Sequence, residues 1–385
     1  MGTWARSIGY FGTMGFFATS ITILGPALPD LAELVGTSIS DLSILFSIRP
    51  LGFLIGSLFA GWVFDKQEGH IYLAVSFLLL SLYFAFVPLN PTFWVLVLMT
   101  AAQGICNGIV VTGASTFIVW EHEDNPQPWV NTQSFINGLG GFSAPLILTF
   151  AYARFGEFSQ AFWILALFAI FLAILFFFIN SPKIRTQKKP KDGGGRNPKA
   201  AVILMTSLFL LYVGTEVSLN SWVFTLATSA YGIPAENARL LNSLFWGAIA
   251  LGRVVNIVLS SRIEPGRQLL ISFIGSAVSS AAILIFRSSA AVLWAGVILT
   301  GWFFAFVFPS LMLYAEKKLS VSGKLSGIFF SATSVGSMIL PFIAGQLLAV
   351  FNVHAMLWVV LAGIAAMNII FLNLQTRLAN RETSR

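Results

Sequence analysis

Apolar segments of about twenty residues recur along the whole chain, and the connections between them leave no room for a soluble domain. We count twelve such segments, the first at about residues 8–28. At about 1.5 Å per residue, each is long enough to cross a hydrocarbon layer of about 30 Å. Because 57% of the residues are hydrophobic and only 10% are charged, an ordinary core would not hide this much apolar surface from water. The sequence therefore predicts an all-α integral membrane protein with twelve transmembrane helices in a lipid bilayer.

A single long polar stretch interrupts this pattern close to the middle of the 385 residues. Residues 181–199, with the sequence SPKIRTQKKPKDGGGRNPK, contain seven Lys and Arg residues against one Asp, and also a Gly triplet. This composition is typical of a solvated, flexible linker. We therefore expect an N-terminal six-helix bundle at 1–180, a basic linker at 181–199 and a C-terminal six-helix bundle at 200–385.

The two halves show signs of an internal duplication. Gly140 precedes Pro145 by five residues in the fifth segment, and Gly336 precedes Pro341 by five in the eleventh. Residues 43–52 and 243–252 also share Ser, Leu and Gly at an offset of 200. Each match is weak alone. Together with the central linker they indicate two six-helix pseudo-repeats in parallel orientation, an arrangement found in secondary transporters.

The basic residues are distributed by side of the predicted membrane. With the N-terminus placed in the cytoplasm, 17 of the 22 Lys and Arg residues fall on the cytoplasmic side, three fall on the other side, and Arg49 and Arg253 lie within segments. The positive-inside rule therefore places both termini and the linker in the cytoplasm. We expect a multi-pass protein of a plasma or inner membrane. Membrane orientation accounts for the basic residues behind the net charge of +7, so this charge does not indicate nucleic acid as a partner.

The connection between the second and third segments reads GWVFDKQEGH. Gly61, Asp65, Lys66 and Gly69 suit a tight turn in which a carboxylate meets backbone N–H groups or a basic side chain at the cytoplasmic rim. This pattern resembles the loop signature of the major facilitator superfamily, with one extra residue before the last Gly and with His70 where a basic residue is usual. The resemblance implies a gating contact, and a plain turn is the alternative.

Polar residues inside the N-terminal segments are few. Arg49 is expected to face the bundle interior, a partner or the membrane interface, because a charge that faces lipid is costly. Gln103 and Asn107 lie four residues apart in the fourth segment, and Gln133 and Asn137 do so in the fifth, so each pair shares one helix face. We expect these four amides to bind a substrate together with Tyr212, Asn220 and Asn242 of the C-terminal segments.

The seventh segment carries the strongest chemical signal. Tyr212, Glu216 and Asn220 recur every four residues as a polar stripe, and Glu216 lies roughly 21 Å into the membrane at about 1.5 Å per residue. A carboxylate at this depth is costly unless it is paired or protonated. Arg253 in the eighth segment is the candidate partner and shares a face with Asn242. Three interpretations stay open: a structural Glu216–Arg253 pair, Glu216 as the ligand of a cation or proton and of the substrate, and separate locations for the two residues.

The most specific sequence runs are Tyr212–Gly214, Glu216, Phe245–Gly247, Gly252–Arg253 and the stretch FPSLMLYAEKKLSVSGK. These runs resemble the fucose, galactose and glucose symporter family of the superfamily, and its branch of sodium-dependent glucose transporters in particular. The proton-coupled fucose transporters of this family carry acidic residues in their first and fourth spans, which are missing from the corresponding segments of this chain. Thr100 stands where proton-coupled members of the superfamily commonly have Arg. The missing acidic residues argue against proton coupling by the route of the fucose transporters, and Thr100 argues against a generic proton–drug antiporter.

The resemblance implies a secondary transporter with the major facilitator fold that moves a hexose by cation-coupled alternating access. Trp246 and Trp302 would stack on the apolar faces of the sugar. Glu216 would couple a co-transported Na⁺ or H⁺, and Arg253 would orient it. No other cofactor and no metal site are expected, and the chain is expected to act as a monomer because its two halves form one path.

Other functions remain as alternatives. An exporter of lipophilic small molecules or drugs of the same superfamily is favoured by the apolar and aromatic composition. A receptor or scaffold without transport activity is disfavoured because the sequence shows no recognition domain. An enzyme is not expected, because no phosphate-binding loop, no nucleophile with a base and no pair of carboxylates in a cavity is recognisable.

Overall fold

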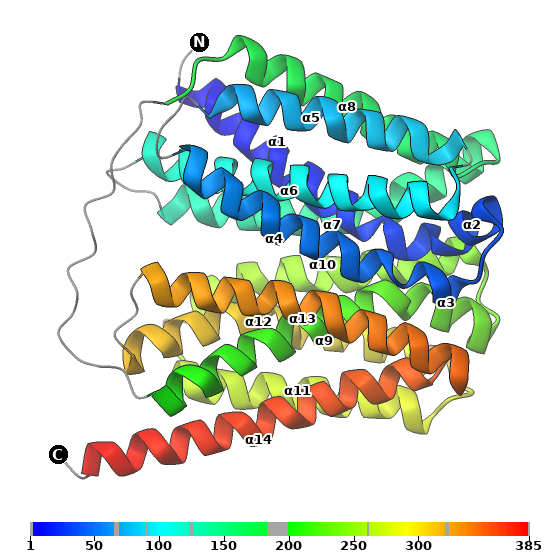
Figure 1. The fold of residues 1–385 in the computed structure, drawn as a ribbon. Coiled ribbons are helices and arrows are strands. Elements are labelled where there is room, and N and C mark those ends of the chain that lie inside the picture. The colour runs from blue at the N-terminus through cyan, green and yellow to red at the C-terminus, as the bar shows by residue number, and fades with distance from the viewer. Residues whose placement is uncertain are drawn as a thin grey trace. The chain divides into compact units, whose positions relative to one another are not determined.

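The computed structural model describes residues 3–64, 69–89, 91–122, 127–182, 199–259, 262–319 and 323–383. In these ranges every regular element is a helix (Figure 1). The chain divides into two compact units. Unit 1 comprises Met1–Thr186 and Ala235–Trp246, and unit 2 comprises Gln187–Pro234 and Gly247–Arg385.

The helices of unit 1 pair tightly along their lengths. The closest pairs are α4 with α6, α5 with α8, and α1 with α7. Their bounds are α1 (Thr3–Thr22), α2 (Leu24–Val35), α3 (Ile39–Leu42), α4 (Leu45–Phe64), α5 (His70–Phe86), the short 3₁₀ helix η1 (Val87–Leu89), α6 (Phe93–Glu121), α7 (Gln127–Phe155) and α8 (Ser159–Phe178).

Unit 2 is built mainly from later elements of the chain, and among its closest pairs only α9 with α13 corresponds to a close pair of unit 1, α1 with α7. Here α13 packs closely on α9, α11 on α12, and α14 on α9. One helix, α10, is divided between the units at Trp246. The bounds are α9 (Lys199–Tyr231), α10 (Ala235–Leu259), α11 (Pro265–Ile285), α12 (Ala290–Lys318), α13 (Gly323–Val350) and α14 (Ala355–Thr383).

The number of membrane-crossing helices is close to the predicted twelve. Ten helices in the described ranges are long and apolar enough to span a bilayer, and the bent pair α1 and α2 makes eleven if it is one span. The remaining long helix, α10, has 25 residues but carries Glu236, Arg239 and Arg253. The predicted all-α, multi-pass membrane fold is therefore confirmed.

The first apolar segment, predicted at about 8–28, is bent by 50° between α1 and α2. The bend follows from Pro26. Proline has no N–H to donate to the carbonyl four residues earlier, and its ring clashes with that carbonyl. This carbonyl belongs to Thr22, the last residue of α1. The chain therefore has a discontinuous helix in its first span.

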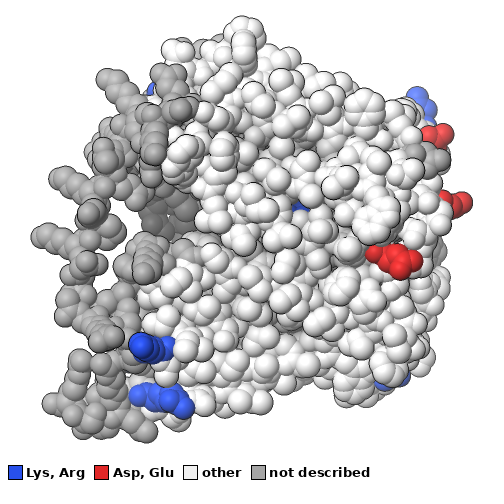
Figure 2. All heavy atoms as spheres, in the orientation of Figure 1, with Lys and Arg blue, Asp and Glu red and all other residues white. Residues whose placement is uncertain are grey.

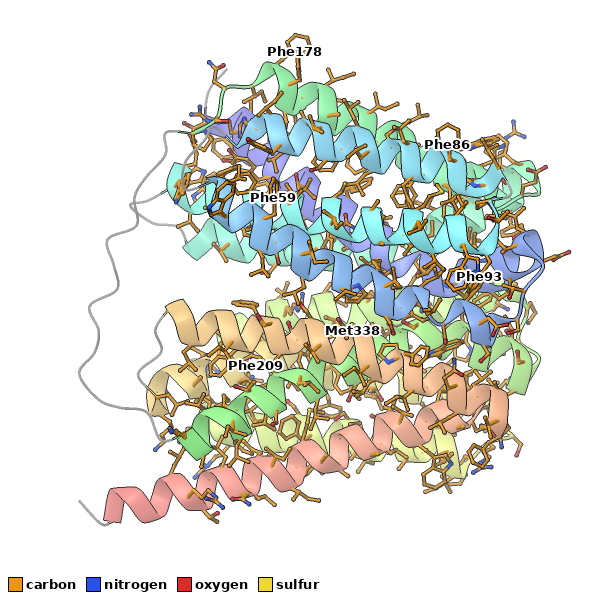
Figure 3. The ribbon with its side chains drawn as sticks, viewed as in Figure 1. Phe59, Phe86, Phe93, Phe178, Phe209 and Met338 are labelled. Carbon is orange, nitrogen blue, oxygen red and sulfur yellow. The ribbon has the colours of Figure 1, made fainter. Side chains whose placement is uncertain are left out.

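The outer surface of each unit is apolar. Phe178, at the end of α8, points away from unit 1 and is 72% exposed (Figure 3). Phe209 on α9, by contrast, is fully buried within unit 2. On the face that Figure 2 shows, charged side chains gather toward the edges, and the broad band between them is almost uncharged. Aromatic and aliphatic groups exposed in such a band suit contact with lipid.

Glycines on the fifth and eleventh segments make equivalent contacts in the two units. A Cβ atom at Gly140 of α7 would overlap the carbonyl oxygen of Gly15 on α1. In unit 2, a Cβ atom at Gly336 of α13 would overlap the carbonyl oxygen of Leu210 on α9. The two glycines therefore let corresponding helix pairs approach to backbone contact. This match supports the duplication inferred from the Gly-to-Pro spacing.

Candidate functional site

The amides of α6 form a buried polar face in unit 1. Gln103 is 2% exposed and Asn107 is 1% exposed. The Asn107 amide donates to the Ser20 hydroxyl of α1 at 3.3 Å. Their carbonyl oxygens, Gln103 Oε1 and Asn107 Oδ1, are buried without a hydrogen-bond partner in the described part of the chain. A buried acceptor without a donor is costly, so these two oxygens are available to hydroxyl groups of a ligand.

The close packing of α4 against α6 fixes the position of these amides. A Cβ atom at Gly104, beside Gln103, would overlap the Arg49 carbonyl of α4. A Cβ atom at Gly108, beside Asn107, would meet the Ser57 nitrogen at 2.7 Å. Both glycines thus bring α4 into backbone contact with α6.

The second amide pair, on α7, has a different environment. Gln133 is 4% exposed, and its Nε2 donates to the Ala114 carbonyl of α6 at 3.0 Å. This bond joins α7 to α6. Asn137 lies one turn further along α7 and is half-buried. In the structure the Gln133 donor thus serves a contact between helices. The role of Gln133 toward a substrate stays a prediction.

The polar stripe of α9 meets Arg253 inside unit 2. Glu216 is 7% exposed and Tyr212 is 1% exposed. The Tyr212 hydroxyl donates to the Phe304 carbonyl of α12 at 3.1 Å and interacts electrostatically with Glu216 and Arg253. Arg253 is half-buried on α10 and interacts electrostatically with Glu216. Of the three interpretations left open by the sequence, separate locations for Glu216 and Arg253 do not fit this arrangement.

The other predicted residues of the C-terminal half are divided between the units. Asn220 on α9 is 6% exposed and belongs to unit 2, whereas Asn242 on α10 is fully buried and belongs to unit 1. The Trp246 ring packs on α7, where a Cβ atom at Gly141 would come within 2.5 Å of it. Trp302 on α12 is half-buried and packs edge-on against Phe306, with ring centres 5.7 Å apart.

The predicted gating loop is described only at its borders. Asp65 and Lys66 lie outside the described residues. Gly61 has open space around the position of a Cβ atom. At Gly69, a Cβ atom would overlap the Phe117 ring of α6, so a side chain there would force this buried ring to move.

His70, which follows Gly69, is a buried structural connection. Its Nδ1 lies 2.8 Å from the Ile179 carbonyl, and its Nε2 lies 2.8 Å from the Tyr10 hydroxyl. The side chain is 2% exposed. It therefore joins α5 to α1 and to the end of α8. The sequence marked this position only as a departure from the usual basic residue.

Sequence reasoning missed a polar cluster formed by Asp30, Tyr152 and Arg239 in unit 1. The Tyr152 hydroxyl donates to the Asp30 carboxylate, and the Arg239 guanidinium carbon lies 4.1 Å from the centre of the Tyr152 ring. No local sequence pattern predicts this cluster, because its members come from three separate helices, α2, α7 and α10. Within the described ranges, no three His, Cys, Asp or Glu side chains gather as metal ligands.

Comparisons with known proteins place the chain among membrane transporters. The family model of the Major Facilitator Superfamily matches residues 10–341. Mouse sodium-dependent glucose transporter 1A is 29% identical over 365 residues, which cover 85% of this chain and 86% of that protein. Sodium-dependent glucose transporter 1 of Xenopus laevis is 30% identical, over 91% of this chain and 78% of that protein.

Solved structures of similar fold have low sequence identity. A mutant form of the nucleoside transporter NupG superposes with a TM-score of 0.77 at 14% identity, over 97% of this chain and 99% of that one. A bacterial homologue of the human lysosomal transporter Spinster, inward-facing and occupied, gives 0.75 at 16% identity, over 98% and 96% of the two chains. At such identities these matches show the fold alone.

Proposed function

The chain belongs to the Major Facilitator Superfamily and is a membrane transporter rather than an enzyme, and on this basis we propose that it moves a monosaccharide, specifically a hexose, by cation-coupled alternating access. The proposed path runs through a single chain, so a monomer suffices. We also propose that both termini face the cytoplasm and that the protein resides in a plasma or inner membrane, in keeping with the positive-inside distribution.

The buried cluster of Tyr212, Glu216 and Arg253 carries this proposal. A carboxylate within a span is costly unless a partner or a proton offsets its charge. Arg253 and the Tyr212 hydroxyl offset part of this cost in the structure. When Na⁺ or H⁺ binds Glu216, its interaction with Arg253 weakens, so the cluster has two arrangements that a cation and a substrate bias together. Coupling requires such a two-state element.

The substrate class rests on the polar face of α6 and on the relatives. Hydroxyl groups of a sugar are donors that match the unpartnered oxygens of Gln103 and Asn107. Aromatic rings such as those of Trp246 and Trp302 suit the apolar faces of a pyranose. The similar proteins of mouse and Xenopus laevis carry the name sodium-dependent glucose transporter, which favours glucose and Na⁺ as the first substrate and ion to test.

The first experiment measures uptake of labelled glucose into proteoliposomes under an inward Na⁺ gradient, an inward H⁺ gradient or no gradient. Uptake above the no-gradient level under one gradient is the expected result and identifies the coupling ion. No uptake under any gradient would reject the hexose proposal. Quenching of tryptophan fluorescence by lipophilic compounds but not by sugars would then favour the exporter.

The role of Glu216 is tested by Glu216→Gln, with Glu33→Gln as the matched control on the exposed surface of α2. We expect Glu216→Gln to abolish accumulation against a gradient while glucose exchange across the membrane continues, because binding survives and coupling does not. Glu33→Gln should accumulate glucose as the wild type does. Equal loss of accumulation and exchange in Glu216→Gln would instead assign Glu216 a structural role.

A further inference from the structure

Arg49 is a buried cation near the middle of the second span. The span runs over Ile39–Phe64, so Arg49 lies about 15 Å from one end and about 22 Å from the other at about 1.5 Å per residue. It is only 8% exposed. A charged side chain at this depth is costly, and snorkelling to the interface does not apply to a group that is buried in the bundle.

The surroundings of Arg49 do not balance its charge. Its Nη1 donates to the Ile21 carbonyl of α1 at 3.1 Å, which uses one of five N–H donors. Among the described residues, the only titratable group that acts on it electrostatically is the Tyr83 hydroxyl, which is neutral. Arg253, by contrast, interacts electrostatically with Glu216. In the described part of unit 1, Arg49 is thus a buried cation without a carboxylate.

A second unpartnered group lies beside the carbonyl that Arg49 contacts. The Thr22 hydroxyl is fully buried and has no hydrogen-bond partner in the described ranges. Ile21 and Thr22 end α1 at the bend that Pro26 imposes. Transporters commonly build their ligand sites at such discontinuous helices near the bilayer midplane. At one break, a guanidinium with spare donors therefore contacts the residue that precedes a buried hydroxyl with a free proton.

We propose that Arg49, together with the Thr22 hydroxyl, binds an anionic group at the α1–α2 bend. The group is either the carboxylate of a sugar acid, which matches the planar fork of the guanidinium, or a free halide ion. Either anion neutralises the charge that the described residues leave unbalanced. The sugar-acid form rests on the proposed function, because it assumes a monosaccharide substrate.

The test measures binding to the purified full-length protein in detergent. Its melting temperature is followed while sodium glucuronate, sodium chloride or glucose is titrated into a buffer whose only other anion is bulky, with the Na⁺ concentration held constant by the sodium salt of that bulky anion. We expect a saturable rise with glucuronate, with chloride or with both, and glucuronate alone would assign the site to a substrate carboxylate. A wild-type protein that responds to neither anion overturns the proposal without any variant.

Three variants and a control locate the site. We expect Arg49→Gln to weaken anion binding by at least about tenfold, Arg49→Lys to retain part of it, and Thr22→Val to weaken it by a smaller factor. Arg267→Gln removes an exposed charge from α11 and should bind as the wild type does. If Arg49→Gln or Arg49→Lys binds the anion as strongly as Arg267→Gln does, the assignment is overturned. The assignment is also overturned if all three variants lose anion binding to the same extent. If Arg49→Gln does not fold, Arg49→Lys and Thr22→Val decide.

Failure of this proposal is distinguishable from failure of the proposed function. Anion binding that depends on Arg49, in a protein that takes up no hexose, would leave the anion site standing and reject hexose transport. Hexose uptake by a protein whose melting temperature and transport rate respond to neither anion would reject the anion site and leave hexose transport standing.

Discussion

Glycine-to-alanine substitutions at the α9–α13 contact test how unit 2 is held together. A methyl group at Gly336 would overlap the Leu210 carbonyl, and a methyl group at Gly214 would come within 2.7 Å of the Gly336 oxygen. Both contacts are with backbone atoms, which cannot rotate away. Ordinary van der Waals contact at a Cβ atom begins at about 3.4 Å, so the helices must separate by about 0.7 Å for Gly214→Ala and by more for Gly336→Ala. The two changes should therefore destabilise unit 2, Gly336→Ala more than Gly214→Ala.

The expected magnitudes follow from overpacking. Gly336→Ala should cost about 3 kcal/mol and Gly214→Ala about 1 kcal/mol, the two ends of the usual range for added methyl groups in a packed interior. Gly61→Ala is the matched control, because nothing surrounds the Cβ position there. In that helix the change should be neutral or stabilise by up to about 1 kcal/mol, since alanine favours helix more than glycine does.

The measurement is the apparent melting temperature of each variant in detergent. We expect a fall of several degrees for Gly336→Ala, a smaller fall for Gly214→Ala and no fall for Gly61→Ala. A Gly336→Ala protein that melts with the wild type, or a Gly61→Ala protein that falls as far, would refute the packing argument. If Gly61→Ala retains its melting temperature but transports more slowly, the gating interpretation of its loop is favoured over a plain turn.

Two further predictions concern the end of unit 1 at which α1 begins. His122 stacks on Trp129 with ring centres 3.6 Å apart. Partial burial lowers the pKa of His122 in the folded protein. As the pH drops below about 6.5, this imidazole is therefore protonated first in the unfolded chain, and the stability of the folded protein falls. His122→Gln should flatten this part of the melting-temperature profile, and an unchanged profile would exclude His122 as its source. Arg6→Gln should cost about 1–3 kcal/mol because Glu121, 6% exposed, loses its partner at 2.7 Å. Adding Glu121→Gln should restore most of the loss, and a double variant less stable than Arg6→Gln would contradict this.

Much of the fold was predictable from the sequence because hydropathy and length are local properties. The apolar segments account for ten helices and the bent first span, and Pro26 explains the bend at Thr22 once the structure shows it. The repeated Gly-to-Pro spacing indicated the duplication, and Gly140 and Gly336 do make matching contacts. The division of α10 at Trp246 was not predictable, because it depends on which unit each part of the helix packs against.

The candidate site was predictable only in part. Helical spacing placed Tyr212 and Glu216 on one face, and the cost of a buried charge suggested Arg253 as the partner. Spacing within one helix says nothing about neighbouring helices, however. The hydrogen bond from Gln133 to the α6 backbone therefore had no signal in the sequence.

The sequence by itself determined the class of the protein and the approximate positions of its spans, since each follows from residues close together in the chain, whereas the division into two six-helix halves stays a prediction. Only the tertiary structure decided which polar groups meet. Arg49 contacts a carbonyl 28 residues away, and His70 contacts groups 60 and 109 residues away. In a low-dielectric interior such contacts determine which charges are balanced, and helix packing alone brings their partners together.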